Sequence, residues 1–263
     1  MTPVINISSA ADPRLTPYRE LKDKRLFKEF GLFIAEGEFL VQRLLDSSFS
    51  IHSVLMTPSR WAKGNWNITE NVPVYLASKD VLSAIVGFPF HRGVLALAKR
   101  PSLPTVQETS FLNVNRLVIL PEINNVENLG VVVRTAAGLR YSHILLGKSC
   151  CDPFARRAIR TSMGAAFLMN FVISSQLPDD LIELQQKHHF EWHAITIAEN
   201  AVPLHHIQPP KRTGLLFGTE ADGLSRNWLQ LCDKTVAIPM APQIDSLNVA
   251  VAAGIVLYHY CDK

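Results

Sequence analysis

Polar and glycine residues follow apolar runs at three places in the second half of the sequence, and these are the places where its residue types could do chemistry. The first place contains Asn128, Gly130 and Arg134. An asparagine and a glycine at a helix entrance let a side-chain amide and bare backbone approach a ligand. An arginine in the second turn of a mostly apolar helix is normally ion-paired or placed to hold an anion. A capping asparagine with a snorkelling arginine explains the same residues without a ligand.

The second place is the segment LLFGTEADGLS over 215–225, in which Gly218 and Gly223 bracket two acidic residues. Glycines permit a ligand to come close to the backbone. The carboxylates between them would repel a pyrophosphate, so the loop favours a cationic or neutral ligand that carries hydroxyl groups. A tight turn with Ser225 as the cap of the next helix is the alternative.

The third place is IPMAPQIDSLNV over 238–249, which precedes the last apolar segment. Asp245 or Ser246 is expected to cap the final helix, with Asn248 in its first turn. The small residues of 250–254 indicate that something packs closely against this helix. Packing of the helix on a sheet accounts for these residues equally well.

Other ligand-binding motifs are missing from the sequence. It contains no GxGxxG after a strand, no GxxxxGK[ST], no HExxH and no GxSxG. A nucleotide-dependent oxidoreductase, the second class of function considered, is disfavoured because its phosphate fingerprints are missing. The nine histidines have no metal-ligand spacing, so no metal is expected.

Taken in this order, the three segments resemble the signature motifs of the SpoU-type methyltransferases in the SPOUT superfamily, and they are similar to those of the TrmH/RlmB group. The matching residues are Asn128, Gly130 and Arg134; Gly218, Glu220 and Gly223; and Ile238, Pro239, Met240, Ser246, Leu247, Asn248 and Val249. The resemblance covers about residues 116–260, and 152–165 is similar to the family's stretch between the first two motifs. Arg140 departs from the family pattern, in which a glycine usually follows the first helix.

The resemblance implies S-adenosylmethionine (AdoMet)-dependent methylation of a ribose 2′-hydroxyl in RNA, with rRNA favoured over tRNA. It implies a homodimer, and an AdoMet pocket in a deep trefoil knot. The implied catalytic residues are Asn128, Arg134, Glu220 and Asn248. The implied cofactor-binding residues are Gly218, Thr219, Glu220, Gly223, Ile238, Met240, Ser246 and Leu247. A catalytically silent protein that binds AdoMet and RNA is the alternative.

Methyl transfer from a sulfonium needs no metal, because the leaving group departs neutral. It requires alignment of the ribose oxygen with the methyl carbon and removal of a weakly acidic proton. An arginine side chain normally stays protonated, so Arg134 is expected to hold a phosphate and orient the 2′-hydroxyl. It could act as a base only if an adjacent phosphate takes over its proton. Arg134, Arg157 and Arg160 are the expected RNA contacts.

Apolar patterning predicts an α/β protein whose C-terminal domain has a mostly parallel sheet. Helices are expected around 18–30, 38–45, 79–87, 129–140, 152–166 and 246–260, and strands at 32–37, 51–57, 72–78, 93–99, 116–120 and 143–147, with further strands downstream. The segment 101–110 contains two prolines among small polar residues and indicates a linker or strap. We therefore expect a small RNA-binding domain over 1–100, similar to the family's substrate-binding domain, and the methyltransferase domain over 111–263.

Composition is that of a globular protein, with 48% hydrophobic and 19% charged residues. Through residue 105 there are 13 Lys and Arg against 9 Asp and Glu, a mildly basic front half that could dock on phosphate. No apolar run reaches the roughly 18 residues that would span a bilayer, and the N-terminus does not resemble a secretory signal. With four cysteines and no CxxC pair, reduced thiols in a cytoplasmic protein are expected.

Overall fold

The computed structural model describes residues 2–19, 23–87, 90–198, 200–219 and 223–261. The chain forms two compact units. The N-terminal unit comprises Met1–Pro101 and Phe154–Phe167, and the C-terminal unit comprises Ser102–Pro153 and Leu168–Lys263. The stretch 154–167 therefore packs with the N-terminal unit, although the sequence places it within 111–263.

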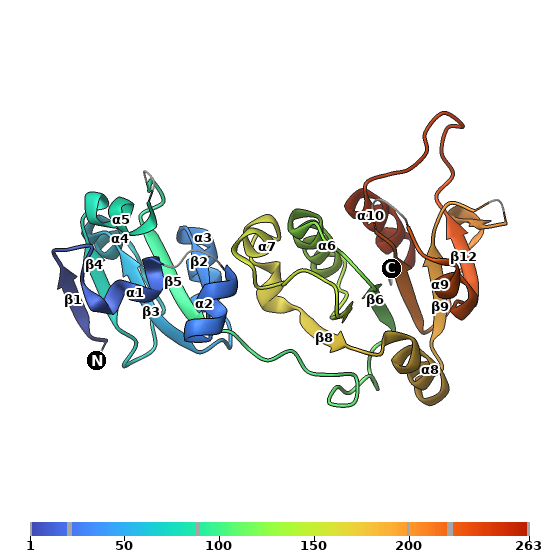
Figure 1. Cartoon of the computed structure of the whole chain (residues 1–263), viewed down its shortest axis with the longest axis horizontal. Coiled ribbons are helices and arrows are strands. Elements are labelled where there is room, and N and C mark those ends of the chain that lie inside the picture. The colour runs from blue at the N-terminus through green and yellow to red at the C-terminus, as the bar shows by residue number, and fades with distance from the viewer. Residues whose placement is uncertain (1, 20–22, 88–89, 199, 220–222, 262–263) are drawn as a thin grey trace. The chain divides into compact units, whose positions relative to one another are not determined.

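The N-terminal unit is built on a five-stranded mixed sheet with the order β1-β4-β3-β5-β2 (Figure 1). The strands β1, β4 and β3 are parallel, and β5 runs antiparallel to both β3 and β2. The strands are β1 (Val4–Ile7), β2 (Leu32–Glu36), β3 (Ile51–Met56), β4 (Val74–Ala77) and β5 (Val94–Lys99). The helices are α1 (Thr16–Arg19), α2 (Asp23–Phe30), α3 (Glu38–Leu45), α4 (Pro58–Lys63), α5 (Lys79–Val86) and α7 (Arg156–Thr161).

A group of phenylalanines accounts for the position of α7 in this unit. Phe154 and Phe167, which flank the helix, lie 5.4 and 5.9 Å from the ring of Phe33 on β2. Both also contact the ring of Phe49. Aromatic pairs at these separations add to the free energy gained by burying their area. The cluster therefore holds 154–167 against the N-terminal sheet.

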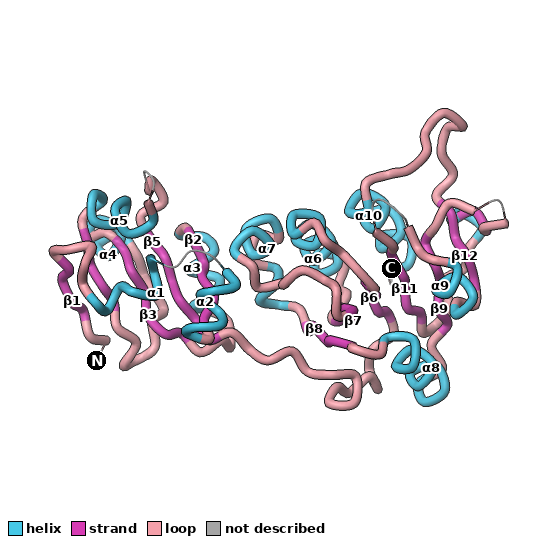
Figure 2. Tube along the Cα trace, in the orientation of Figure 1, coloured by secondary structure: helices cyan, strands magenta, loops and turns pink. Residues whose placement is uncertain are grey.

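The C-terminal unit is built on a seven-stranded sheet with the order β10-β12-β9-β11-β6-β7-β8, and every adjacent pair is parallel (Figure 2). The strands are β6 (Arg116–Leu120), β7 (His143–Gly147), β8 (Asn170–Ser174), β9 (Glu191–Ile195), β10 (Val202–Pro203), β11 (Thr213–Phe217) and β12 (Lys234–Ala237). The helices are α6 (Val126–Gly138), α8 (Leu177–His188), α9 (Arg226–Leu231) and α10 (Val249–Tyr260). The predicted parallel sheet is confirmed.

Helices cover both faces of this sheet because its strands are apolar on both sides. Alternate strand residues such as Leu117 and Ile119 join a buried cluster with Leu181 of α8, and Trp228 of α9 packs against it. The intervening residues, such as Val118, point to the opposite face, and α6 and α10 pack against each other. In the chain portion that the structure describes, no helix has the length and apolar character needed to cross a bilayer.

Two helix starts differ from the sequence prediction. Asn125 caps α6, because its side-chain oxygen accepts hydrogen bonds from the backbone N–H groups of Glu127 and Asn128. Asn128 therefore lies inside the first turn. Asn248, and not Asp245 or Ser246, caps α10. In both cases the asparagine that caps is the residue whose side chain reaches the free backbone N–H groups of the first turn.

The end of α6 explains the unusual Arg140. This residue has φ +66°, in the left-handed region that glycine adopts without strain. The backbone N–H of Arg140 donates to the carbonyl of Ala137, and that of Tyr141 donates to the carbonyl of Ala136. These two bonds define a Schellman ending of the helix. The backbone thus keeps the conformation for which the family uses glycine.

The segment between the units lies along the C-terminal unit. Thr105 forms a parallel β-bridge with Ile173 of β8, and the backbone N–H of Ile173 donates to the carbonyl of Pro104. Val106 is buried in the same cluster as the sheet residues. The second part of 101–110 is therefore a strap on the sheet.

Candidate functional site

Two cavities lie beside the loop that follows β11, at the carboxyl ends of the parallel strands. The loop cavity measures about 380 Å³ and the β6 cavity about 500 Å³. Gly218, Thr219, Gly223 and Val249 line both. Open parallel sheets bind ligands at this edge, because the loops that follow the strands converge there.

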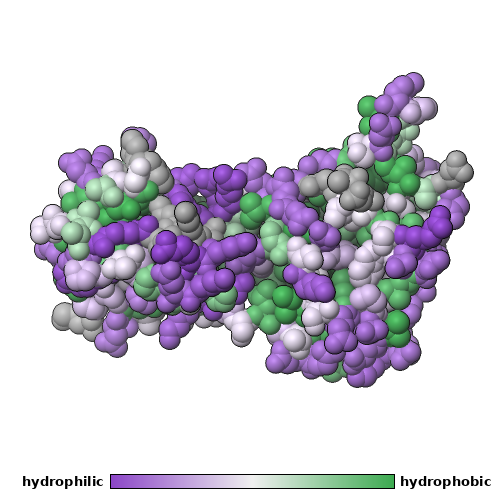
Figure 3. All heavy atoms as spheres, viewed as in Figure 1, coloured by the Kyte–Doolittle hydropathy of each residue, from purple (hydrophilic) through white to green (hydrophobic). Residues whose placement is uncertain are grey.

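The loop cavity brings together the loops after β9, β11 and β12. Its lining residues are Ile195, Thr196, Ile197, Phe217, Gly218, Thr219, Gly223, Ile238, Met240, Asp245, Ser246, Leu247, Val249 and Ala252. Seven of the residues predicted for the cofactor lie in this lining: Gly218, Thr219, Gly223, Ile238, Met240, Ser246 and Leu247. The eighth, Glu220, lies outside the described residues. The segment 238–248 projects from the body of this unit (Figures 1 and 2), and hydrophobic atoms lie along it among hydrophilic ones (Figure 3).

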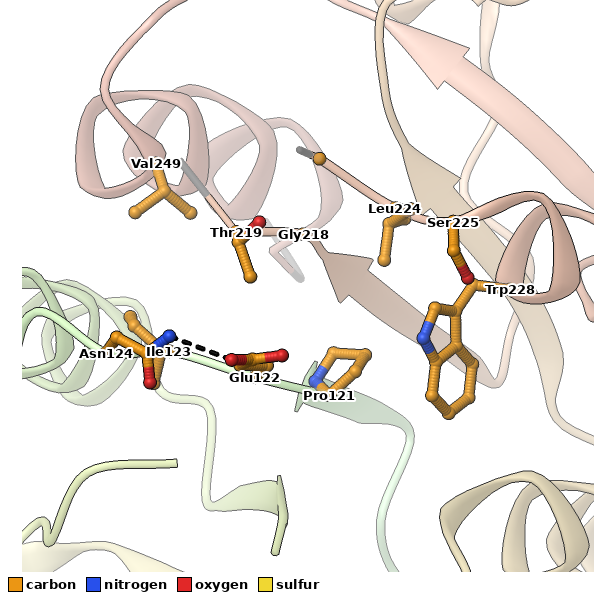
Figure 4. Close-up of a pocket in the computed structure, with 11 residues that line it drawn as sticks. Pro121, Glu122, Ile123, Asn124, Gly218, Thr219, Leu224, Ser225, Trp228 and Val249 are labelled. Carbon is orange, nitrogen blue, oxygen red and sulfur yellow. Dashed lines mark hydrogen bonds between the residues drawn. The ribbon is translucent and has the colours of Figure 1, made fainter. Parts of the chain in front are cut away.

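The β6 cavity is lined by residues that sequence reasoning did not select. Glu122 and Asn124, in the loop after β6, face Thr219 and Ser225 across the cavity, and Trp228 of α9 closes one side (Figure 4). The side-chain amide of Asn124 donates to the Glu122 carboxylate at 2.8 Å. Glu122 and Asn124 come shortly after the buried strand β6. This position was the signal by which the sequence could have indicated them, because the loops that follow parallel strands lie at the binding edge of the sheet.

Two glycines make the turn between the cavities narrow. A Cβ on Gly218 would lie 2.2 Å from the carbonyl carbon of Gly223, so the backbones approach more closely than any side chain permits. Thr219 and Gly223 exchange two backbone hydrogen bonds, and Gly223 has φ +64°. Ser225 stands at the N-cap of α9, but its side chain makes no capping hydrogen bond.

Three of the four predicted catalytic residues, Asn128, Arg134 and Asn248, lie on α6 and at the start of α10. The side-chain amide of Asn248 donates to the side-chain oxygen of Asn128 at 3.2 Å. The same Asn248 caps α10 immediately before Val249, which lines both cavities. The structure therefore brings two of the four predicted catalytic residues into contact beside the cavities. The fourth, Glu220, lies outside the described residues.

Arg134 does not line either cavity. Its side chain is exposed on α6 and makes no hydrogen bond or ion pair with another described residue. An exposed guanidinium with no protein partner can bind an external anion. The other predicted RNA contacts, Arg157 and Arg160, lie on α7, which belongs to the N-terminal unit.

The described part of the chain also bears on two further kinds of chemistry, metal binding and nucleophilic attack by the Cys150 thiol. It contains no group of three or more His, Cys, Asp or Glu residues that could hold a metal ion. Burial raises the pKa of the Cys150 thiol to about 12, and its Sγ donates to the carbonyl of Leu120 at the end of β6. This thiol stays protonated at neutral pH and is not a nucleophile.

The chain belongs to the SpoU rRNA Methylase family, whose family model matches residues 115–258. A second model, described as an MRM3-like substrate binding domain, matches residues 12–95. The resemblance seen in the motifs is thereby confirmed.

Individual relatives agree with this assignment over nearly the whole chain. An uncharacterized tRNA/rRNA methyltransferase of Mycobacterium tuberculosis is 36% identical and covers 97% of this chain and 91% of its own length. The Bacillus subtilis 23S rRNA (guanosine-2′-O)-methyltransferase RlmP is 25% identical, and the match covers 96% of this chain and 98% of RlmP. A crystal structure of an AdoMet-bound rRNA methyltransferase from Sinorhizobium meliloti superposes with a TM-score of 0.85 at 26% identity, over 98% of this chain and 97% of that one.

Proposed function

We propose that this protein transfers the methyl group of AdoMet to a ribose 2′-hydroxyl of RNA, and that ribosomal RNA is its substrate. The observation that carries this proposal is the loop cavity, where residues from the second and third motifs meet beside the contact between Asn128 and Asn248. Family membership and the rRNA methyltransferases among the relatives support the same reaction. The protein would work in the cytoplasm, where ribosomal RNA is available.

The lining of the loop cavity fits AdoMet. Its volume lies within the range of small-ligand sites. Phe217, Ile238 and Leu247 supply apolar surface for an adenine ring, and the glycine turn lets backbone groups come close to the ligand. Asp245 is the charged residue among the described residues of this lining, and a carboxylate suits a positively charged ligand. AdoMet supplies an activated methyl group on a sulfonium centre.

Orientation of the substrate ribose is assigned mainly to side chains of α6 and of the start of α10. Arg134 holds a substrate phosphate and orients the 2′-hydroxyl through its exposed guanidinium. Asn128 and Asn248 fix the geometry of the two helix starts, so that the ribose oxygen is presented in one orientation. Glu220 is proposed as the fourth member of this group. Arg157 and Arg160 would contribute further phosphate contacts.

A homodimer would place a second copy against α10. This helix is apolar on all sides, yet Val251, Ile255 and Tyr258 are exposed by 52, 41 and 68%. Their i, i+4, i+7 spacing puts them on one stripe, and the adjoining helix α6 exposes Val131. Exposed apolar patches of this kind mark association sites. Sedimentation of the protein should give a dimer, and Tyr258→Glu should shift it toward monomer.

We also propose that the chain threads the trefoil knot of its family, with 1–100 as the RNA-binding domain and 111–263 as the catalytic one.

The proposal is tested by incubation of the purified protein with methyl-labelled AdoMet and separated rRNA and tRNA fractions. After digestion, the label should be found in a 2′-O-methylnucleoside from the rRNA fraction. Label in a base, or in tRNA alone, would contradict the proposal. AdoMet binding without transfer to naked rRNA or to ribosomal particles would support a catalytically silent RNA-binding protein instead.

Arg134→Ala provides the sharpest test of the catalytic assignment. Because the side chain is exposed and has no partner in the described structure, the substitution should change the free energy of unfolding by no more than about 0.5 kcal/mol. Transfer should fall by at least about 100-fold, since a positioned charge is lost, while AdoMet binds as before. The matched control is Arg140→Ala, which removes an exposed arginine just beyond the same helix. Undiminished transfer by Arg134→Ala would falsify the assignment.

A further inference from the structure

The N-terminal unit contains a cavity of about 310 Å³ that is rich in arginine. Arg60, Arg92 and Arg160 line it together with the aromatic ring of Phe39 and with Met163. All of these residues belong to the N-terminal unit, since α7 packs there. The cavity thus lies in a different unit from the cavities beside the β11 loop.

Glycines with positive φ hold the arginine stems in place. Each lies directly against the aliphatic part of one arginine: Gly37 against Arg92, Gly93 against Arg60 and Gly164 against Arg43. A Cβ on these glycines would lie 3.3, 3.2 and 2.9 Å from the respective arginine carbon. Larger residues would crowd these positions. The backbone therefore leaves room for Arg60 and Arg92, which line the cavity, and for Arg43, which donates to the carbonyl of the lining residue Met163.

Positive charge exceeds negative charge in this group. Glu36 is buried and pairs with Arg156 at 2.6 Å and with Arg92 at 3.5 Å. Glu38 pairs with Arg60. Three arginines, Arg60, Arg92 and Arg160, thus line the cavity against the two carboxylates of Glu36 and Glu38. Such an excess around a cavity attracts an anion such as phosphate.

An exposed aromatic ring adjoins these charges. Phe39 at the start of α3 is 52% exposed, and the Arg43 guanidinium lies 4.9 Å from its ring centroid. Arg43 also donates to the carbonyl of Met163, which has φ +52° although it is not a glycine. This conformation ends α7, because the N–H of Met163 donates to the carbonyl of Arg160 and that of Gly164 donates to the carbonyl of Ile159, a Schellman ending like that at Arg140. An exposed ring beside arginines is the arrangement on which unpaired nucleic-acid bases stack.

We propose that this cavity binds one unpaired nucleotide of the RNA substrate, with its phosphate held by Arg60, Arg92 and Arg160 and its base stacked on Phe39. The inference rests on the proposed RNA substrate and adds where and in which form the RNA is held. An unpaired nucleotide fits better than a duplex. In a duplex the bases are stacked inside the helix, so Phe39 could not reach a base face.

The test measures fluorescence anisotropy of the full-length protein with a labelled single-stranded oligouridylate of about 12 nucleotides and with a duplex of the same length. Phe39→Ala should weaken binding of the single strand by about tenfold and leave duplex binding unchanged, while Phe39→Tyr restores it. Arg160→Ala should lower the slope of log K against log salt for the single strand by about 0.7. Lys79→Ala is the matched control, because Lys79 is an exposed residue of α5 outside the cavity lining and its loss removes one positive charge. It should change neither the affinity for the single strand nor the salt slope.

Binding of the single strand by Phe39→Ala as tightly as by the unchanged protein would overturn the proposal. So would equal effects of Arg160→Ala and Lys79→Ala. Calorimetric titration with AdoMet keeps the two proposals apart. Failure of the unchanged protein to bind AdoMet counts against the methyltransferase assignment, whereas the RNA-binding result is read from anisotropy alone.

Discussion

The side-chain amide of Asn248 donates to the side-chain oxygen of Asn128, and this 3.2 Å hydrogen bond joins the first turns of α10 and α6 across 120 residues of sequence. The orientation of the Asn248 amide is set by its second role. Its oxygen accepts hydrogen bonds from the N–H groups of Ala250 and Val251, which leaves the amide nitrogen to face Asn128. One side chain therefore both starts a helix and aligns it with its neighbour.

Two substitutions of Asn248 separate these roles. Asn248→Ala removes the cap and should lower the free energy of unfolding by about 1 kcal/mol. Asn248→Ser keeps a capping oxygen but is too short to reach Asn128, so its stability should remain within a few tenths of a kcal/mol. Both should slow methyl transfer, as measured with labelled AdoMet alongside urea unfolding. Full activity of the serine variant would show that the contact does not position the catalytic residues.

Gly218→Ala should abolish AdoMet binding. The new Cβ would collide with the backbone of Gly223, so the turn between the two cavities must open. Gly138→Ala is the matched control, because a Cβ at that position on α6 meets no atom within 4 Å. The control should keep its affinity in calorimetry and gain about 0.5 kcal/mol or more of stability. Equal AdoMet affinity in the two variants would contradict a ligand role for the narrow turn.

Replacing Arg140 by glycine should stabilise the protein. The left-handed conformation costs a non-glycine residue about 1 kcal/mol or more, and glycine removes that cost. Part of the gain is offset by the greater freedom of glycine in the unfolded chain. A net rise of roughly 0.5 kcal/mol in urea unfolding is expected. A fall would indicate that the arginine side chain has a stabilising contact.

Stability should fall as the pH drops below about 6.5, the ordinary pKa of a histidine. His193 is buried, with Nδ1 2.5 Å from the Tyr260 hydroxyl and Nε2 2.7 Å from the Glu191 carboxylate. Burial lowers the pKa of His193 and outweighs the raising effect of Glu191. The unfolded chain therefore binds a proton more readily, and stability is lost as the pH falls below the ordinary histidine value of about 6.5.

The control for this pH effect is His193→Gln, which cannot take up the proton. Its free energy of unfolding should decline less steeply over the same range. Some decline should remain, because burial also lowers the pKa of His143. An identical slope in both proteins would assign the acid sensitivity to other groups.

Much of the C-terminal fold could be predicted from sequence because its strands are unbroken apolar runs. The predicted bounds 116–120 and 143–147 coincide with β6 and β7. The short helix α4 (Pro58–Lys63) was missed, since six residues with none buried leave no apolar period to detect. The order of the strands was also beyond prediction. It depends on contacts between distant segments, and local patterning carries no information about them.

The motif residues of the loop cavity could be selected because a known family supplies their spacing, and the structure brings seven of them together. Glu122, Asn124 and Trp228 were not selected. Each has an ordinary neighbourhood in the sequence, and only folding brings the loop after β6 to face α9. The grouping of α7 with the N-terminal unit has the same origin, since it depends on phenylalanines more than 100 residues apart.

The position of β6 in the sheet has a consequence for synthesis on the ribosome. This strand starts the C-terminal unit, yet it pairs with β11, and the guanidinium of Arg116 at its first residue donates to the carbonyl of Tyr260 across 144 residues. Neither partner exists while the early part of the unit is being translated. One edge of β6 therefore stays unpaired in the nascent chain until β11 has been synthesised, and unpaired apolar strand edges favour aggregation. Pulse-labelled chains that stop before β11 should accordingly depend on chaperones, whereas finished chains should not.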